Sequence, residues 1–489
     1  MRIIYFDIDT LRPDHLGCYG YSRDTSPNID QIARDGVIFS HSYTSDSPCV
    51  PSRAALISGR FGVHNGVVTH WGPGSTFRFP SYDSGTDHEF SGDSPLFSRY
   101  LRQFGMRTIS FSSFADRHKT PWFMAGWNEV HTFTLKEGNE NADEVYNAVL
   151  PWLKHYGAQD NYFLHVHFWD PHRNYTMPPE WADLFRDDDM PLWPDQALID
   201  AQQATDYALC SASELWRDTN VSPVAAMPNH IVTENDLRRL INGYDGAIRY
   251  ADHHIGLILQ VLEQLGVLND TAIIVSADHG ESLGEHGVYA NHVDATEAAQ
   301  RVPLIVRWPQ GRHHAVAHRF IYQMDLISTI CELLGIPIPV GWEGESFADA
   351  ISGQNSRTPR DHLIWGHGLY TCQRAVRTDR WLFIRTYHPG LYAWEPETLY
   401  DMQNDVHETT NVARQHPDVI KTMTQMLSNW YAEYVYRPGY GEDPMQTVVT
   451  DGPWRYIRLD AWLQHLRNQG KEQAAQTIWD RIQQWPQSL

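Results

Sequence analysis

The chain has 489 residues, of which 42% are hydrophobic, and a formal net charge of −22 from 38 basic and 60 acidic residues. This acidic balance argues against binding to nucleic acid or to an anionic membrane, so an anionic substrate would need a local cationic or metal site. No apolar run is long enough to span a bilayer and no secretory leader is visible, so we expect a cytoplasmic protein, longer than one average domain and without a membrane span.

Short apolar runs alternate with helical patterns along the first part of the chain. The expected strands are residues 3–8, 108–111, 162–168, 272–276 and 302–306. The expected helices are residues 26–35, 51–59, one that ends over 100–105, 142–155 and 237–265. Strands that alternate with helices in this way predict a mostly parallel α/β sheet covered on both faces.

Residues 186–235 interrupt this alternation. They contain the acidic run Asp187-Asp188-Asp189 and several prolines but no clear strand. We interpret them as an insertion that either caps the functional site or forms a subunit contact, which would make the protein a homo-oligomer. A solvent-exposed acidic loop is the alternative that such runs favour.

The pattern changes near residue 355. Residues 371–385 are typical of two antiparallel strands joined by a tight turn, and residues 417–434 are typical of an amphipathic helix. Residues 436–489 follow as a helical tail that packs on a neighbour. We therefore predict a catalytic α/β domain over residues 1–355 and a smaller α+β domain over residues 356–489.

Polar side chains follow three of the expected strands. Asp9 closes the first strand, Asp170 and His172 follow the strand at 162–168, and Asp278-His279 follows the strand at 272–276. Functional loops in open α/β sheets lie at the carboxyl ends of the strands. We therefore expect these residues to form one site.

Cys49 is one of five cysteines, which are scattered, odd in number and without a CxxC pair. Such a set is not a disulfide framework and fits a reducing compartment. Cys49 precedes Pro51, which suits the first turn of a helix. A cysteine at a helix N-terminus is a candidate reactive thiol, although a lone cysteine is more often a buried structural residue.

The residues around Cys49 favour the reactive reading. Residues 49–53 read CVPSR and residues 56–60 read LISGR, and these runs resemble the signature of the type I, formylglycine-dependent sulfatases of the alkaline phosphatase superfamily. Further similar segments are residues 17–20 (GCYG), 301–306 (RVPLIV), 399–401 (LYD) and 411–413 (NVA). The resemblance implies a large, mixed, mostly parallel sheet sandwiched by helices, with a smaller C-terminal α+β domain that carries an antiparallel sheet.

The resemblance also implies a nucleophile and a cation. In that family the cysteine that matches Cys49 is oxidised to formylglycine by a maturation enzyme, its hydrated aldehyde attacks sulfur, and the arginine that matches Arg53 holds it. Asp9, Asp278 and His279, together with Cys49, would bind one divalent cation. Carboxylates at converging strand ends suit calcium or magnesium, whereas an imidazole also suits manganese, and we expect calcium.

One carboxylate of the family is replaced. The family has an Asp-Asp pair after the first strand, where this chain has Asp9-Thr10. Asp7 lies on the same strand face as Asp9, two residues back, and would compensate as a cation ligand. The pair Asp278-His279 matches the Asp-His variant that also occurs in phosphonate monoester hydrolase relatives.

The anion-binding groups also depart from the family. His172 matches the family's Asp-Pro-His segment, which implies that it contacts the sulfate or protonates the leaving oxygen. Two lysines of the family are absent from the segments that contain Arg117-His118 and Asn291-His292. We expect Arg117, His118 and His292 to supply the positive charge and Asn291 to bind the substrate. His292 is also the second candidate for the acid.

We therefore predict a sulfatase that hydrolyses a sulfate ester or a sulfamate. Tryptophans such as Trp122, Trp169 and Trp365 hint at a small sulfated sugar as substrate, although large aromatics are more often core residues. One alternative is a phosphonate or phosphate mono- or diester hydrolase on the same scaffold. The other is a catalytically inactive sugar-binding relative with an unmodified Cys49.

Overall fold

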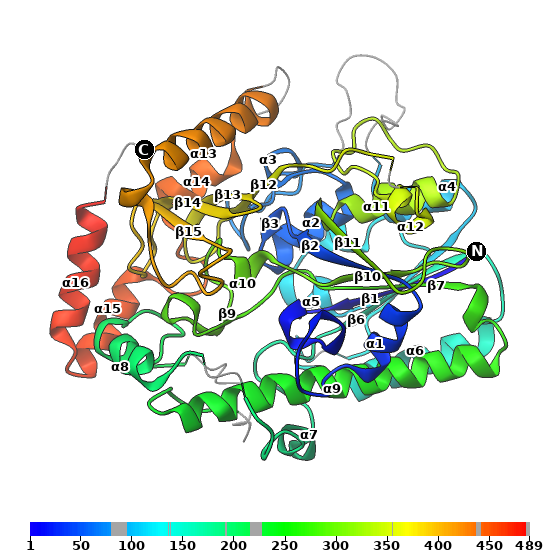
Figure 1. The fold of residues 1–489 in the computed structure, drawn as a ribbon, viewed down its shortest axis with the longest axis horizontal. Helices are drawn as coiled ribbons and strands as arrows, with labels where there is room; N and C mark the ends of the chain where they lie inside the picture. Colours follow the sequence, from blue (N-terminus) through cyan, green and yellow to red (C-terminus); the bar gives the residue numbers. More distant parts are fainter. Residues whose placement is uncertain are drawn as a thin grey trace.

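The computed structural model describes residues 1–79, 95–134, 136, 138–190, 193–215, 227–354, 356–436 and 442–485. Its centre is an eight-stranded sheet in the order β11-β2-β10-β7-β1-β6-β4-β5 (Figure 1). The strands are β1 (Arg2–Ile8), β2 (Val37–Tyr43), β4 (Arg107–Phe111), β5 (Glu129–His131), β6 (Tyr162–Phe168), β7 (Thr271–Ser276), β10 (Leu304–Arg307) and β11 (Ala315–Tyr322). β10 runs antiparallel to β2 and β7, and the other neighbouring pairs are parallel, which confirms the predicted mostly parallel sheet.

Helices cover both faces of this sheet, as Figure 1 shows. On β1, Ile4, Phe6 and Ile8 pack into one apolar cluster, whereas Ile3 and Tyr5 pack into another, because successive side chains of a strand point to opposite faces. The first cluster includes residues of α1 (Pro27–Arg34), α6 (Ala142–Tyr156) and α9 (Glu234–Gln264), and the second includes residues of α2 (Cys49–Ser58), α4 (Phe97–Gln103) and α11 (Asp325–Leu333).

The longest of these helices, α9, begins at a capping box. The Thr233 side chain accepts a hydrogen bond from the Asp236 backbone N–H, and the Asp236 side chain accepts one from the Thr233 backbone N–H. This reciprocal arrangement satisfies backbone donors that a helix start leaves free. Neither α9 nor any other helix of the described ranges combines the length and apolar character needed to cross a membrane.

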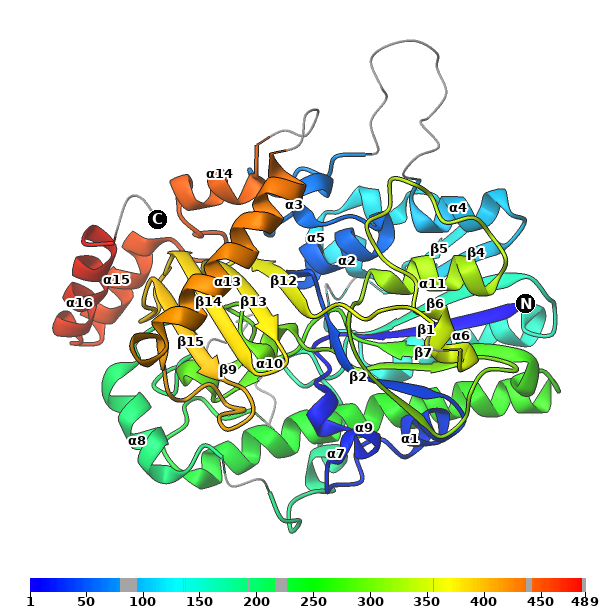
Figure 2. The same cartoon turned by 45° about the horizontal axis from the view of Figure 1, so that its top comes forward.

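A second sheet has five strands in the order β15-β14-β13-β12-β3 (Figure 2). Its strands are β3 (Asp46–Ser47), β12 (His362–His367), β13 (Cys372–Thr378), β14 (Trp381–His388) and β15 (Glu397–Asp401). β13 and β14 form the antiparallel pair expected at residues 371–385. β3 pairs in parallel with β12 and lies just before Cys49, so the second sheet reaches the start of α2. The domain division at residue 355 stays a prediction.

The tail is helical, as expected, and packs on the second sheet. It forms α14 (Pro444–Asp451), α15 (Leu459–Asn468) and α16 (Glu472–Gln483). Trp462, Leu466 and Ile478 are buried in the same apolar cluster as Leu382 and Phe383 of β14. The second sheet therefore buries the apolar faces of the helices that follow it.

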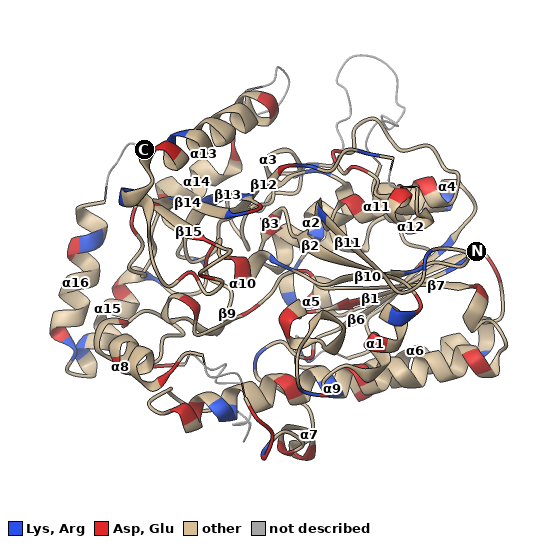
Figure 3. Ribbon diagram, viewed as in Figure 1, with Lys and Arg blue, Asp and Glu red and all other residues tan. Residues whose placement is uncertain are grey.

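The stretch over residues 186–235 combines an exposed acidic run with a helix that the sequence did not indicate, α8 (Gln196–Thr205). Asp187, Asp188 and Asp189 are all exposed, in agreement with the solvent-exposed loop. They follow α7 (Pro179–Asp183), which packs on α9, and Figure 3 shows this acidic segment on the outer side of α9. Residues 191–192 and 216–226 of the stretch lie outside the described residues.

Candidate active site

Three strand ends bring the expected acidic residues together. β1 lies between β6 and β7, so the residues that follow these strands leave the sheet at one edge. The Asp9 backbone N–H donates to the carbonyl of Phe168 at 2.9 Å, and the Thr10 backbone N–H donates to the Asp278 carboxylate at 3.2 Å. Asp9 and Asp278 thus meet at the carboxyl end of the sheet, as their places in the sequence predicted.

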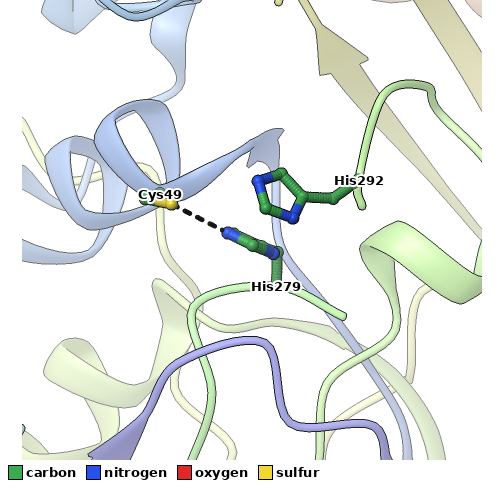
Figure 4. A group of neighbouring side chains, drawn as sticks. All are labelled: Cys49, His279 and His292. Carbon is green, nitrogen blue, oxygen red and sulfur yellow. Dashed lines mark hydrogen bonds between the residues drawn. The ribbon is translucent and has the colours of Figure 1, made fainter. Parts of the chain in front are cut away.

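Cys49 is the first residue of α2 and faces this edge. Its Sγ lies 3.0 Å from Nε2 of His279, and the ring of His292 lies beside that of His279 with 4.0 Å between centroids (Figure 4). One potential ligand atom from each of Cys49, Asp9, Asp278 and His279 lies within 4.8 Å of the other three, and all four residues are buried. The predicted nucleophile and three of the four predicted cation ligands besides it therefore form one compact group.

Arg53 lies one turn after Cys49 on α2 and is buried among carboxylates. Its Nε donates to Asp7 at 3.0 Å, and its Nη1 forms ion pairs with Asp9, at 3.2 Å, and with Asp278. Burial would raise the pKa of Asp7, but Arg53 and His165 outweigh it and hold that pKa below its ordinary value. Asp7 thus pairs with Arg53, as Asp9 and Asp278 do, but it is not one of the four residues whose potential ligand atoms lie together.

The group retains oxygen atoms suited to a cation. Among the described residues, the two carboxylate oxygens of Asp9 and the hydroxyl of Thr10 are buried and form no hydrogen bond, although Oδ2 of Asp9 keeps its ion pair with Arg53. Burial raises the pKa of Asp9 and of Asp278, against the opposing charge of Arg53. Unsatisfied buried oxygens beside an imidazole are the donor set of a hard divalent cation, so the residues present fit such an ion.

Thr10 adopts an unusual backbone conformation at this position. Its φ of +57° lies in the left-handed region, which β-branched residues rarely adopt. The Asp278 carboxylate accepts from its N–H, and the Tyr244 hydroxyl donates to its carbonyl at 2.6 Å. Contacts on both sides of the residue therefore hold the strained backbone next to the candidate cation ligands.

The two candidate acids lie on one side of Cys49. The rings of His172 and His292 have centroids 6.3 Å apart, and both residues are buried. Burial and the charges of Arg117 and Arg173 lower the pKa of His172, and burial with the neighbouring histidines lowers that of His292. Both imidazoles are therefore neutral in the free protein and would have to take up a proton to act as an acid.

The expected anion-binding residues occupy different positions around the group. Arg117, on α5 (Phe114–His118), lies over the ring of Trp169 at 5.1 Å, and its charge only partly opposes the burial that raises the pKa of Cys49. His118 is buried, and neither of its ring nitrogens has a hydrogen-bond partner among the described residues. Asn291 instead donates to Sγ of Cys210 at 2.9 Å, so its amide is directed toward the insertion.

The tryptophans do not all lie at the site. Trp169 contacts the ring of His172, with 5.7 Å between centroids. Trp365 is fully buried and stacks on Tyr43 at 5.0 Å, because it belongs to the core between the second sheet and the first. The suggestion that Trp365 belongs to a sugar site is therefore wrong, and its large ring fills the apolar core instead.

Two pairs of residues that sequence reasoning missed complete the surroundings. His70 places Nε2 3.4 Å from the Val50 backbone N–H, and its Nδ1 is 2.6 Å from the Tyr456 hydroxyl. No spacing in the sequence connects residues this far apart. Arg173 and Glu281 form the second pair, and Glu281 lies 3.4 Å from Nδ1 of His292. Because they come directly after the motifs that contain His172 and His279, the sequence could have indicated them.

Comparison with protein-family models and with known proteins supports the same assignment. The model described as Sulfatase matches residues 2–336, and the model described as N-sulphoglucosamine sulphohydrolase, C-terminal, matches residues 284–433. An N-acetylglucosamine-6-O-sulfatase of Bacteroides thetaiotaomicron is 23% identical over 93% of this chain and 90% of its own length. An arylsulfatase of Clostridium perfringens is 24% identical over 84% of this chain and 90% of its own.

Solved structures share the fold. A protein in complex with its substrate D-glucosamine-2-N,6-O-disulfate superimposes with a TM-score of 0.69 at 20% identity, covering 89% of this chain and 98% of that one. The phosphonate monoester hydrolase of Agrobacterium radiobacter superimposes with a TM-score of 0.70 at 21% identity, covering 88% and 96%. Because the Sulfatase model covers more than half of the residues, the chain belongs to the sulfatase family of sulfuric ester hydrolases, within the alkaline phosphatase superfamily.

Proposed function

We propose that this sulfatase hydrolyses a sulfate ester, or a sulfamate, of a carbohydrate, with a formylglycine made from Cys49 and one divalent cation. The observation that carries the proposal is the buried group of Cys49, Asp9, Asp278 and His279 at the carboxyl edge of the sheet. The family supplies the sulfuric ester chemistry, and the group supplies a place for the nucleophile and the cation.

The surroundings of Cys49 argue against a thiolate nucleophile. Burial raises the pKa of the Cys49 thiol, and the charges of Asp9 and Asp278 raise it further. A thiol with a raised pKa is mostly protonated at neutral pH and attacks poorly. Oxidised by a maturation enzyme, Cys49 would supply a hydrated aldehyde instead, and a calcium ion, or manganese or magnesium, would polarise it and the sulfate.

The residues of the chain have separate tasks in this proposal. Asp9, Asp278 and His279 would hold the cation, and Arg53 balances their charge. Arg117 would attract and orient the sulfate group, since electrostatic stabilisation of a transferring anion requires fixed positive charge. His172 or His292 would protonate the leaving oxygen, and the negative charge of the arriving sulfate favours the proton that either imidazole needs.

The carbohydrate part of the proposal rests on the relatives and on the chemistry near Cys49. The first-named relative is an N-acetylglucosamine-6-O-sulfatase, and one structural neighbour holds a sulfated glucosamine. Trp71 and Tyr456 lie near the site with ring centroids 4.6 Å apart, and Trp71 is 37% exposed. Exposed aromatic faces beside cationic groups suit a sulfated sugar ring.

The experiment that tests the proposal is a screen of sulfated saccharides with protein co-expressed with the maturation enzyme. Sulfate release should occur with the wild-type protein and should fall to the blank with Cys49→Ala. Release that is equal in both proteins would rule out the Cys49 chemistry.

A phosphonate ester is the second candidate substrate. The Asp278-His279 pair and the structural similarity to a phosphonate monoester hydrolase favour it. Turnover of 4-nitrophenyl sulfate and of a 4-nitrophenyl phenylphosphonate ester by the same preparation separates the two. We expect the sulfate to have the higher kcat/KM, and the reverse order would replace the sulfatase proposal.

A further inference from the structure

The C-terminal helices carry a groove that neither family model covers. The groove has a volume of about 790 Å³ and is lined by residues from the end of α14 to α16, among them Arg455, Arg458, Arg467, Trp454 and Trp479. The family models end at residues 336 and 433, so this part of the chain lies beyond both. Figures 1 and 2 place α15 and α16 beyond the second sheet.

The groove gathers arginines in an acidic protein, and acidic side chains pair with two of them. The chain carries a net charge of −22, yet the groove is lined by three arginines and two aspartates. Arg458 pairs with Asp460 at 3.1 Å and Arg467 pairs with Glu472 at 3.2 Å, both at the surface. Such exposed ion pairs are weak, so a sulfate or carboxylate group can replace the protein's own acid as the partner.

The tryptophans give the groove an apolar component. Trp479 on α16 is 42% exposed, and Trp454 lies at the start of the segment that leads to α15. An aromatic ring offers a flat apolar face, against which the C–H face of a sugar ring packs. Guanidinium groups beside one exposed and one half-buried indole ring therefore match a chain that alternates anionic substituents with apolar sugar faces.

A short succession of contacts joins the groove to the nucleophile. Arg455, which lines the groove, donates from Nη2 to the Pro73 carbonyl at 3.2 Å. Its neighbour Tyr456 contacts Nδ1 of His70 at 2.6 Å, and His70 in turn contacts the Val50 backbone next to Cys49. One segment of the tail thus borders the groove on one side and the active site on the other.

We propose that this groove binds the extended part of an anionic saccharide chain whose sulfated unit lies at Cys49. The inference rests on the proposed sulfatase function and narrows its substrate class to oligosaccharides with several sulfate or carboxylate groups. The Trp71–Tyr456 pair lies between the two places and would support the sugar units that connect them. A monosaccharide sulfate would reach the active site but not the groove.

The first experiment measures binding without turnover. Heparin-derived and chondroitin-sulfate-derived oligosaccharides of increasing length are titrated into Cys49→Ala protein by calorimetry. Affinity should rise about tenfold or more from the shortest to the longest chain of at least one series, since additional contacts add avidity. The triple change Arg458→Gln, Arg467→Gln and Trp479→Ala should abolish this increase. Affinity that does not depend on length in either series, or that survives the triple change, would overturn the inference.

A matched control separates the groove from general surface charge. The triple change Arg312→Gln, Arg414→Gln and Phe104→Ala removes the same number of arginines and one exposed aromatic ring at other exposed positions. It should retain the length dependence, and melting temperatures should show that both triple variants are folded. Loss of length dependence in the control to the same extent would mean that net charge, and not the groove, binds the chain.

The second experiment separates failure of this inference from failure of the proposed function. Sulfate release by the modified enzyme is measured on the same length series, with and without the groove substitutions. The groove variant should lose about tenfold more kcat/KM on the longest chains than on the shortest. If release depends on Cys49 but the groove variant loses kcat/KM equally on long and short chains, the groove inference is overturned and the proposed function stands. Absence of release from every saccharide and from aryl sulfates, despite length-dependent binding, overturns the proposed function alone.

Discussion

Thr10 occupies a position that strongly affects the charge of the active site. A carboxylate there would add one more negative charge to those of Asp7, Asp9 and Asp278, all of which pair with Arg53. The threonine hydroxyl is buried without a hydrogen-bond partner among the described residues, and its backbone is strained at a φ of +57°. We interpret the position as one that binds a cation less tightly than an acidic pair would.

The change Thr10→Asp should strengthen cation binding. It adds a carboxylate to the group, and aspartate adopts left-handed backbone more readily than a β-branched residue. The rise in Tm when calcium is added to chelator-treated protein should be larger in the variant, with about 1.4 kcal/mol of extra stability for each tenfold gain in affinity. Without a cation the variant should melt below wild type, because the added carboxylate is repelled by those of Asp9 and Asp278.

Thr10→Ser is the control for this prediction, because it keeps a hydroxyl and the charge of the wild type. Its calcium-dependent rise in Tm should match that of wild type. If Asp, Ser and Thr at this position give the same rise, the cation does not bind at the group that contains Asp9 and Asp278.

The lowered pKa of His172 predicts an acidic pH dependence. A group that must be protonated to act loses its effect as the pH rises through its pKa. Burial and the charges of Arg117 and Arg173 lower the pKa of His172 below 6.5, so the fall in kcat/KM should begin below pH 6.5. Arg117→Gln removes one of these charges and should move the fall to higher pH. If kcat/KM of the wild type stays flat or rises between pH 6 and 8, a histidine with a lowered pKa is not the general acid.

Leaving-group dependence identifies which histidine is the acid. A general acid contributes about 10²- to 10⁴-fold to a reaction whose leaving oxygen must be protonated. One of the two variants His172→Asn and His292→Asn removes the acid, and the kcat of that variant on a sugar sulfate should fall by this factor. The same variant should cost far less on 4-nitrophenyl sulfate, whose leaving group departs without a proton. Equal losses on both substrates for both variants would show that neither histidine has this role.

At the scale of elements, the site depends on how β3 and α2 join. β3 pairs with β12 of the second sheet, and α2 begins directly after it with Cys49, while the C-terminal segment that carries Tyr456 closes over His70. The nucleophile therefore lies where the two sheets and the tail meet. A change in the tail should affect turnover although it lies far away in the sequence.

Tyr456→Phe tests this connection. The change removes the hydroxyl that fixes His70 and leaves the ring in place, so kcat should fall about two- to tenfold, the effect of one hydrogen bond. Tyr431→Phe is the matched control, because it removes another tyrosine hydroxyl bonded to Arg374 on the second sheet. The control should leave kcat unchanged. Equal values of kcat for wild type and Tyr456→Phe would show that the tail does not position His70 for catalysis.

The elements that the sequence predicted best are those with strong local patterns. β1, β6 and β7 are continuous apolar runs buried on both faces, and α6 and α9 have long amphipathic patterns. β2 was missed because Ser40, His41 and Ser42 interrupt its apolar run, and β3 because two residues form no pattern. The antiparallel direction of β10 depends on its neighbours in the sheet, which no local signal specifies.

The same distinction applies to the site. Cys49, Arg53, Asp9, Asp278 and His279 were predicted because short motifs and strand ends contain them, and the fold brings them together. The contact between His70 and Tyr456 joins residues 386 positions apart, so only the folded chain reveals it. Asp7 was expected as a further cation ligand beside Asp9, but its carboxylate is not among the four potential ligands that the fold brings together.

At the scale of the whole molecule, charge is distributed unevenly. The net charge of −22 repels an anionic substrate at a distance, whereas Arg117 near Cys49 and the arginines of the groove on the C-terminal helices would attract it locally. Long-range repulsion is screened by salt and short-range attraction in a buried site is screened less. If the proposed groove binds the saccharide chain, a substrate that reaches both places at once would bind more tightly than one that reaches only Cys49.

The most direct test of the account compares protein produced with and without the maturation enzyme. Intact mass measures the fraction of chains in which Cys49 has been oxidised, a loss of about 18 Da. Sulfate release from the best saccharide of the screen is then measured for preparations with different fractions. Release should be proportional to the oxidised fraction, and Cys49→Ala should release none. Equal release from oxidised and unmodified protein would contradict this expectation.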